Sequence, residues 1–465
     1  MKRKILLPIV AGALIASAST ALISCGSSET NNPDELRIVL YNAGWGDEWL
    51  NDTINSWEEK NPGKAVNLTS LYEVNTLIGR RLVSSDNSDD LYITTYNGWR
   101  NYAAQGLFAP LDDLLKETVD GVTVEEKVDD AFDDHLYFKN SDGSKHCYRL
   151  PWTSGMGGIY YNAKMFEENG WEIPKTTEEL TALVNQIKED RIPVAGDDTA
   201  TVVPFAYSGQ NTDYFDYAVL TWWMQLAGED AVKEFFNYSS ADNFNSNNAS
   251  GIYDELKTAV TYWYSLFSDS SNYLSGSIDY SNHDAQRAVF NGRAAMVFTG
   301  DWVYNEVLKY GTNSNFELGF IGTPTITGAK ESGITYAIGS DQYIAIPESS
   351  TEKDLAKSFI KEMISNAQLS NFTNKAHGFL AYDNGDTSTI DTSNSYIKSY
   401  LDVRNETTTR ISDESDAMIY LNQDIQNIWV TSASRPFLGL LQGSVTIDDA
   451  FDTIYKQAQS AFAEY

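Results

Sequence analysis

The sequence predicts an α/β fold in which sheets are flanked by helices. Strand-like and helix-like segments alternate from Leu36 to Thr95, which favours parallel strands connected by helices. The composition, with 42% hydrophobic and 21% charged residues, is that of a folded globular protein. A length of 465 residues indicates two or three domains.

The first elements form a β-α-β-α-β series. Apolar runs predict strands over 36–41, 66–71 and 90–95, and helical spacing of apolar residues predicts helices over 49–57 and 76–83. The sequence Asn-Pro-Gly directly after the first helix stops it. Such a series places ligands at the carboxyl ends of the strands.

Further elements follow in the rest of the chain. An apolar and aromatic run over 150–161 begins a new unit, and Thr176 with Glu179 forms a capping box at the start of a helix. The other expected elements are a helix over 216–228, a loop over 237–250, a helix over 284–290 ended by Asn291-Gly292, a strand over 294–298, a helix capped by Thr351 with Asp354, and a C-terminal helix over 447–462.

Charge and aromatic content narrow the ligand class. The chain has 65 Asp and Glu against 33 Lys and Arg, a net charge of −32, which disfavours nucleic acid as a partner. A neutral ligand meets no such repulsion. Aromatic residues make up 13% of the chain, including 11 Trp, and tryptophan rings stack on flat apolar faces such as those of sugars.

The first 33 residues predict export and anchoring. A basic start and an apolar stretch over 5–23 are typical of a secretory leader, and the junction before Cys25 resembles a bacterial lipobox. We therefore expect a lipoprotein signal peptide over 1–24, acylation of Cys25, and a flexible tether over 25–33. The protein would lie on the extracytoplasmic face of the cell membrane. The alternative is that Cys25 is an ordinary thiol after an ordinary cleavage site.

The sequence gives little support to metal, cofactor or enzyme readings. Cys147 is the single thiol after Cys25, and no Cys and His spacing matches a zinc site, so we expect no metal and no cofactor. There is no Gly-x-Ser-x-Gly motif and no phosphate-binding loop spacing. A carboxylate pair for glycoside hydrolysis stays open, because that site is defined by separation in space.

Seven short motifs in a fixed order carry a family resemblance. They are Asn61-Pro62-Gly63; Asp90-Leu-Tyr; Gly106-Leu-Phe-Ala-Pro-Leu111; Leu150-Pro-Trp152 with Tyr160-Tyr-Asn162; Pro174 before Thr-Glu-Glu-Leu180; Phe290-Asn-Gly-Arg-Ala-Ala-Met296 with Gly300-Asp-Trp302; and Ile344-Ala-Ile-Pro347. In this order the chain resembles the family 1 extracellular solute-binding proteins, which include the maltose-binding protein and its relatives that feed sugar ABC transporters.

The resemblance implies a two-lobe periplasmic-binding-protein-like fold of type II, with each lobe a sheet flanked by helices and a ligand cleft between the lobes. It implies lobe 1 over 34–148 and 321–377, and lobe 2 over 149–320 and 378–465. It further implies a non-enzymatic, monomeric protein that captures a carbohydrate and docks on ABC permease subunits.

A sugar site needs flat aromatic rings together with carboxylate or amide groups for the hydroxyls. The predicted ligand-binding residues, most of them in loops at strand ends, are Trp45, Glu73, Tyr96, Asn97, Trp152, Trp223, Asp301, Trp302 and Trp429. The last of these rests on the resemblance alone. Trp222 and Trp223 cannot face the same way on a helix, so one of the two is expected in the core. The remaining tryptophans that we assign to packing are Trp49, Trp57, Trp171 and Trp263.

Two hypotheses of different classes result. The first is a lipid-anchored binding component of a carbohydrate importer, in which ligand shifts an equilibrium between open and closed forms. The second is a surface glycoside hydrolase or glycan-capturing lipoprotein. Turnover of an oligosaccharide separates the two.

Overall fold

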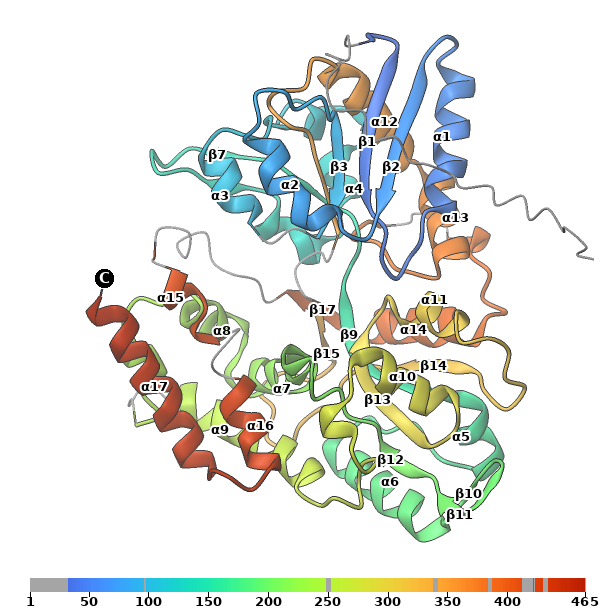
Figure 1. Ribbon diagram of the computed structural model, residues 1–465, viewed down its shortest axis with the longest axis vertical. Coiled ribbons are helices and arrows are strands. Elements are labelled where there is room, and N and C mark those ends of the chain that lie inside the picture. Colours follow the sequence, from blue (N-terminus) through green and yellow to red (C-terminus); the bar gives the residue numbers. More distant parts are fainter. Residues whose placement is uncertain are drawn as a thin grey trace, which may run out of the picture. The chain divides into compact units, whose positions relative to one another are not determined.

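The computed structural model describes residues 32–95, 98–247, 252–337, 342–383, 387–411, 421, 423–429 and 434–464. Two large sheets dominate this part of the chain (Figure 1), and each is packed against its own hydrophobic core. The predicted leader, Cys25 and the predicted tether up to residue 31 lie outside the described residues. Among the helices that the structure describes, none combines the length and apolar character needed to cross a membrane.

The first sheet contains the predicted β-α-β-α-β series. Its strands, in spatial order, are β2 (Ala65–Leu71), β1 (Glu35–Tyr41), β3 (Leu91–Thr94), β16 (Tyr343–Ala345) and β8 (Leu150–Pro151). β1 pairs in parallel with both β2 and β3, which confirms the predicted strands and their direction. β16 pairs antiparallel with β3 and β8, so later parts of the chain complete this sheet.

Helices cover the first sheet and bury aromatic side chains against it. The helix α1 (Glu48–Lys60) buries Trp49 and Trp57 on its apolar face, as the spacing predicts. The other helices and short elements of this part are α2 (Val74–Leu82), α3 (Trp99–Ala104), η1 (Leu114–Lys116), β4 (Thr118–Val119), β5 (Val122–Thr123), α4 (Val124–Lys127), η2 (Asp130–His135), β6 (Phe138–Lys139), β7 (Lys145–His146), α12 (Lys353–Met363) and α13 (Asn366–Ala376). Cys147 is fully buried in this core.

The second sheet is mixed. Its path runs β12 (Val203–Phe205), β13 (Ala294–Gly300), β9 (Met156–Asn162), β15 (Ile334–Ala337) and β17 (Thr408–Ile411), with β14 (Leu318–Ile321) also paired to β9. β9 is antiparallel to β13, β14 and β15, and all seven of its residues are buried. A strand buried on both faces reads as a continuous apolar run, which is how it appears in the sequence.

The part of the chain around the second sheet contains more helices than the first, and some of them pack on one another. The helices are α5 (Ala163–Asn169), α6 (Thr177–Asp190), α7 (Asp216–Ala227), α8 (Glu229–Phe235), α9 (Ile252–Phe267), α10 (Asn282–Phe290), α11 (Val303–Leu308), α14 (Ser395–Glu406), α15 (Gln423–Gln426), α16 (Ser434–Leu441) and α17 (Ile447–Ala463). The short elements are β10 (Pro193–Val194), β11 (Asp197–Thr201), η3 (Thr212–Phe215), η4 (Ala241–Phe244), η5 (Ser277–Asp279) and η6 (Thr387–Thr389). α7 is buried almost all round, since α9, α8 and the sheet pack against it.

Most local signals of the sequence are confirmed, and one is wrong. Thr176 forms the predicted capping box, and Gly292 takes a left-handed conformation with φ of 68° after α10. The predicted N-cap at Thr351 is wrong by one residue. Glu352 is the N-cap residue of α12 and makes no side-chain cap bond, and Thr351 Oγ1 donates to the Glu352 carboxylate at 3.2 Å. The predicted loop over 237–250 includes the short helix η4, which Ser240 caps.

Three segments connect the parts of the chain that form the two sheets: the first lies between β8 and β9, the second between β15 and β16, and the third between α13 and α14. Backbone hydrogen bonds join them. Trp152 N and Thr153 N donate to Gln342 O at 2.7 and 3.2 Å, and Ser154 N donates to Phe379 O at 2.8 Å. The chain returns from the second sheet to the first between β15 and β16, after the predicted lobe boundary at 320/321. The lobe limits as a whole stay a prediction.

Candidate functional site

Trp302 packs against the cores of both sheets. It follows β13 directly, is the N-cap residue of α11, and is partly exposed. Its ring meets Trp45 edge-on, with centroids 6.4 Å apart and planes at 87°. On the other side it lies 6.1 Å from Tyr214 and 6.1 Å from Tyr217. Aromatic residues from η3, α7 and the loop after β1 therefore meet around one ring.

Glycines make room for this aromatic group. A Cβ on Gly300 would overlap the Trp302 ring, and one on Gly157 would overlap the Tyr217 ring. A Cβ on Gly44 would lie 2.7 Å from Trp302 Cβ. Because real Cβ atoms do not approach so closely, the position of Trp302 depends on the missing side chains at Gly44 and Gly300.

The start of α11 also contacts the end of α13. Asn305 Nδ2 donates to Ala376 O at 2.6 Å and lies 3.4 Å from Trp45 O. Tyr304 stacks on His377, with ring centroids 4.1 Å apart and planes at 17°. Burial lowers the pKa of His377, which favours the neutral ring in this stack. Trp302 is thus one of several α11 residues that join the two cores.

Asp301 lies beside Trp302 but is fully buried. Ser154 Oγ donates to its Oδ2 at 2.9 Å, and the Tyr396 hydroxyl donates to its backbone oxygen at 2.8 Å. Burial first, and then the nearby Asp301 carboxylate, hold the pKa of Tyr396 and Tyr400 well above the usual range, so both hydroxyls stay neutral donors.

The structure brings three of the predicted site residues together: Trp45, Asp301 and Trp302. Trp45 is 4% exposed, so it joins the group from the core side. Tyr214 and Tyr217 belong to the same group and were missed by sequence reasoning. Their signal is the aromatic spacing within Tyr214-Phe-Asp-Tyr217 just before and inside a predicted helix.

Other predicted residues lie in the cores. Trp152 is fully buried and stacks on Trp49, with centroids 5.1 Å apart. Trp223 is also fully buried and lies 5.9 Å from Trp429 in an aromatic cluster with Phe235. Trp222 is equally buried, since α7 has no exposed face. A role of Trp152, Trp223 and Trp429 in ligand binding stays a prediction.

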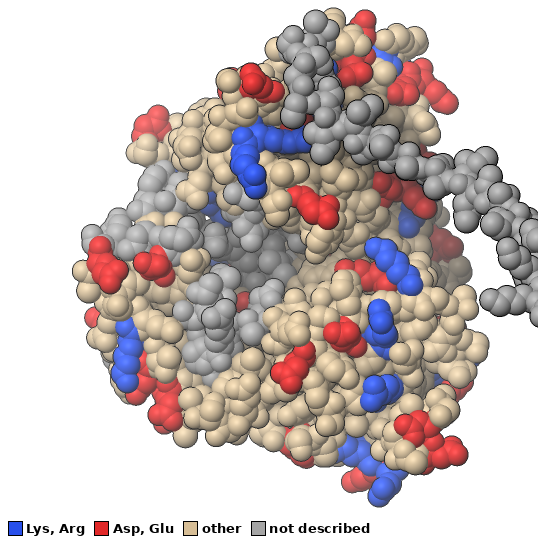
Figure 2. Space-filling view, in the orientation of Figure 1, with Lys and Arg blue, Asp and Glu red and all other residues tan. Residues whose placement is uncertain are grey.

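The remaining predicted residues lie after strands of the first sheet. Glu73 is exposed and is the N-cap residue of α2, without a side-chain cap bond. Tyr96 and Asn97 lie outside the described residues. The face of the molecule in Figure 2 shows acidic side chains with basic ones scattered among them, in line with the net charge of −32. No group of three His, Cys, Asp or Glu residues suited to a metal occurs in the described part of the chain.

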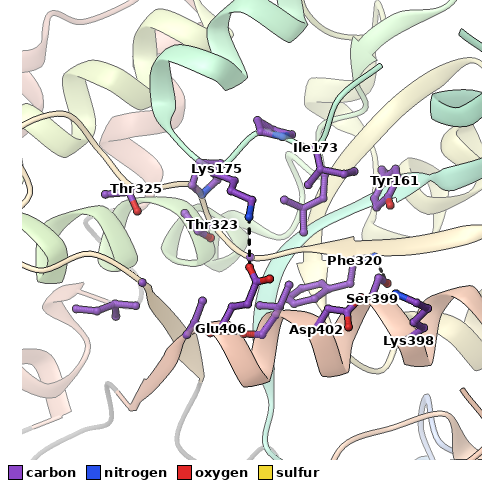
Figure 3. A pocket seen from close by; sticks show the side chains of 18 of the residues that line it. Tyr161, Ile173, Lys175, Phe320, Thr323, Thr325, Lys398, Ser399, Asp402 and Glu406 are labelled. Atoms are coloured by element: carbon purple, nitrogen blue, oxygen red, sulfur yellow. Dashed lines mark hydrogen bonds and ion pairs between the residues drawn. The ribbon is translucent and has the colours of Figure 1, made fainter. Parts of the chain in front are cut away.

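A separate cavity of about 540 Å³ lies against β14 and α14 in the second sheet. Figure 3 shows Lys175 reaching across it to Glu406, and Lys175 Nζ lies 3.5 Å from Glu406 Oε2. Lys398 Nζ lies 2.6 Å from Asp402 Oδ2. Ser399 Oγ accepts from Phe320 N at 2.9 Å and so covers the free edge of β14. The four charged residues at this cavity therefore form two ion pairs with one another.

Comparison with known proteins points in one direction. A family model described as bacterial extracellular solute-binding protein matches residues 42–369. The chain is 24% identical to the multiple sugar-binding protein of Streptococcus mutans over 362 residues, which cover 75% of this chain and 76% of that protein. It is 20% identical to the diacetylchitobiose binding protein NgcE of Streptomyces coelicolor, over 75% of this chain and 71% of that one. A solved chitin oligosaccharide binding protein matches with a TM-score of 0.67 at 18% identity, over 93% of this chain and 99% of that one, which shows a shared fold.

Proposed function

Because the chain belongs to the family of bacterial extracellular solute-binding proteins, we propose that it captures a mono- or oligosaccharide and delivers it to an ABC importer. The names of the similar proteins support a sugar as the ligand class. The net charge of −32 supports a neutral ligand over an anionic one.

The observation that carries this proposal is the packing of Trp302. A partly exposed tryptophan that contacts two separate cores can offer a ring face to a sugar, and its position depends on how the two cores meet. Trp45 meets it edge-on from the first core. We propose Trp302 as the stacking face, with hydroxyl partners among the predicted residues Glu73, Tyr96 and Asn97, which follow β2 and β3 in the sequence.

The proposed mechanism is binding without chemistry. A sugar that contacts both cores favours the arrangement in which they meet, and so shifts an equilibrium between open and closed forms. The closed form would then dock on the permease subunits of the importer. Only the difference in sugar affinity between the two forms drives the shift.

We further propose that the protein works as a monomer held at the extracytoplasmic face of the membrane. The support is the leader-like sequence and the lipobox-like junction before Cys25, whose acyl chains would hold the protein on a flexible tether. The family description itself supports an extracellular location.

The test is calorimetric titration of a soluble form that begins at Gly26. The titrants are N,N′-diacetylchitobiose and a panel of neutral mono-, di- and trisaccharides. We expect saturable binding of at least one of them. Trp302→Leu should weaken it about 10- to 100-fold, because stacking on an aromatic ring contributes about 1–3 kcal/mol.

The matched control is Trp57→Leu, which removes a ring buried in α1 beside Phe359. This control should lower the melting temperature and leave the affinity unchanged. If no saccharide binds, the sugar proposal fails. If Trp302→Leu melts lower yet binds like the parent chain, Trp302 belongs to the core and not to the ligand site.

A further inference from the structure

We propose that Asp301 is a positioning residue. Its bond to Ser154 couples the segments that connect the two sheets to the contact that Trp302 makes with a sugar. This inference rests on the proposed function of Trp302 as the stacking face. It assigns to Asp301 a role inside the protein, next to the ligand and without touching it.

The first support is the hydrogen-bond chain around Asp301. Ser154 Oγ donates to Asp301 Oδ2 at 2.9 Å and lies 2.8 Å from the Tyr400 hydroxyl. A serine hydroxyl has one proton, so when Ser154 donates to Asp301, Tyr400 donates to Ser154. Asp301 and Tyr400 are fully buried and Ser154 is 4% exposed, so water does not replace these bonds at low cost.

The second support is where Ser154 lies in the chain. It belongs to the short connection between β8 of the first sheet and β9 of the second. Its backbone N donates to Phe379 O, in another connecting segment, and the Phe379 ring stacks on Tyr400 with centroids 3.3 Å apart. One serine therefore joins two connecting segments to α14 and to the end of β13.

The third support is the adjacency of Asp301 and Trp302. The Tyr396 hydroxyl holds the Asp301 backbone oxygen at 2.8 Å, so both ends of Asp301 are fixed. Trp302, the next residue, meets Trp45 of the first core. Asp301 and Trp302 share one planar peptide unit that contains the Asp301 backbone oxygen, so a shift of the Trp302 backbone acts on Asp301 and on its bond with Ser154.

The chain offers a closely matched control. Asp90 is 3% exposed and accepts from Ser350 Oγ at 2.7 Å and from Arg37 N at 3.0 Å. This pair has the same chemistry as Asp301 with Ser154, but Arg37 lies in β1 and Ser350 lies between β16 and α12, so neither partner connects the two sheets. Loss of the Asp90 pair should therefore cost stability without changing how the two sheets meet.

The experiment measures the distance between two spin labels in ligand-free protein. Labels go on Tyr72→Cys, directly after β2 of the first sheet, and on Leu308→Cys, at the end of α11 beside the second; these side chains are 65% and 54% exposed. In a form that begins at Gly26 the one native thiol is Cys147, whose full burial protects it from labelling. Asp301→Asn and Ser154→Ala are compared with Asp90→Asn and Ser350→Ala.

We expect Asp301→Asn and Ser154→Ala each to raise the ratio of longer to shorter label separations about 3- to 10-fold, which is less than the full strength of a hydrogen bond to a charged group. The double variant should add little, since both changes break the same bond. For a sugar bound by the parent chain, the dissociation constant should rise by the factor by which the population at the shorter separation falls. The two control variants should melt lower with unchanged distances.

Unchanged distances in folded Asp301→Asn protein, or equal shifts in the control variants, would overturn the inference. If Asp301→Asn does not fold, Tyr400→Phe removes a single hydroxyl of the same chain of bonds and gives the same test. The distance measurement needs no sugar. Failure of the parent chain to bind any saccharide would therefore refute the proposed function by a separate result.

Discussion

Replacing Gly300 with alanine tests whether the position of Trp302 matters for ligand binding. A Cβ at residue 300 would overlap atoms Cζ3 and Cη2 of the Trp302 ring, so the ring must move. Moving a packed ring in this way costs about 1–3 kcal/mol of folding free energy. The new ring position also loses the stacking face, which contributes about 1–3 kcal/mol to binding.

Gly319→Ala is the matched control for this prediction. Its Cβ would overlap the Tyr161 ring, in the same sheet as Gly300, and Tyr161 packs on Phe166. It therefore imposes a comparable packing cost away from Trp302 and from the bonds of Asp301. Both variants should melt a few degrees lower than the parent chain, and calorimetry should show weaker sugar binding for Gly300→Ala alone, by about 5- to 100-fold.

The outcome decides between two readings of Trp302. Equal affinity of Gly300→Ala and Gly319→Ala, at similar losses of stability, would refute the reasoning that the ring position serves the ligand. Weaker binding by both variants would show that general strain in the second sheet, and not the ring, controls affinity.

Two further predictions concern anchoring and shape change. Cys25→Ser should abolish acylation, so that the chain no longer carries covalent lipid in a detergent extract, while sugar affinity stays the same; lipid on the Ser variant would contradict the lipobox interpretation. Saturating sugar should reduce the radius of gyration in solution scattering, because closure about connecting segments buries surface. An unchanged radius at proven saturation would indicate a rigid glycan-capturing module.

Local patterns in the sequence predicted much of the fold. The strands β1, β2 and β3 and their parallel order followed from alternating apolar runs, and the capping box at Thr176 and the left-handed Gly292 followed from residue type and spacing. The predicted cap at Thr351 was wrong because α12 begins at Lys353, so that Glu352 and not Thr351 holds the N-cap position. Spacing alone does not place a helix end to within one residue.

The candidate site was only partly predictable. Gly300-Asp-Trp302 at a strand end marked a position where a ring could be presented, and the structure places that ring between two cores. Sequence alone did not indicate that Asp301 faces Ser154, because that contact joins residues 147 positions apart. The full burial of Trp222 and Trp223 likewise depends on α8 and α9 covering α7.

The central claim is reversible sugar binding without turnover. The most direct measurement incubates the soluble chain with the saccharide that binds in calorimetry, and follows tryptophan fluorescence and reducing ends in the same sample. Binding without turnover predicts a saturable fluorescence change with the saccharide recovered intact. New reducing ends that accumulate with time in proportion to the protein would contradict it, and would favour a glycoside hydrolase instead.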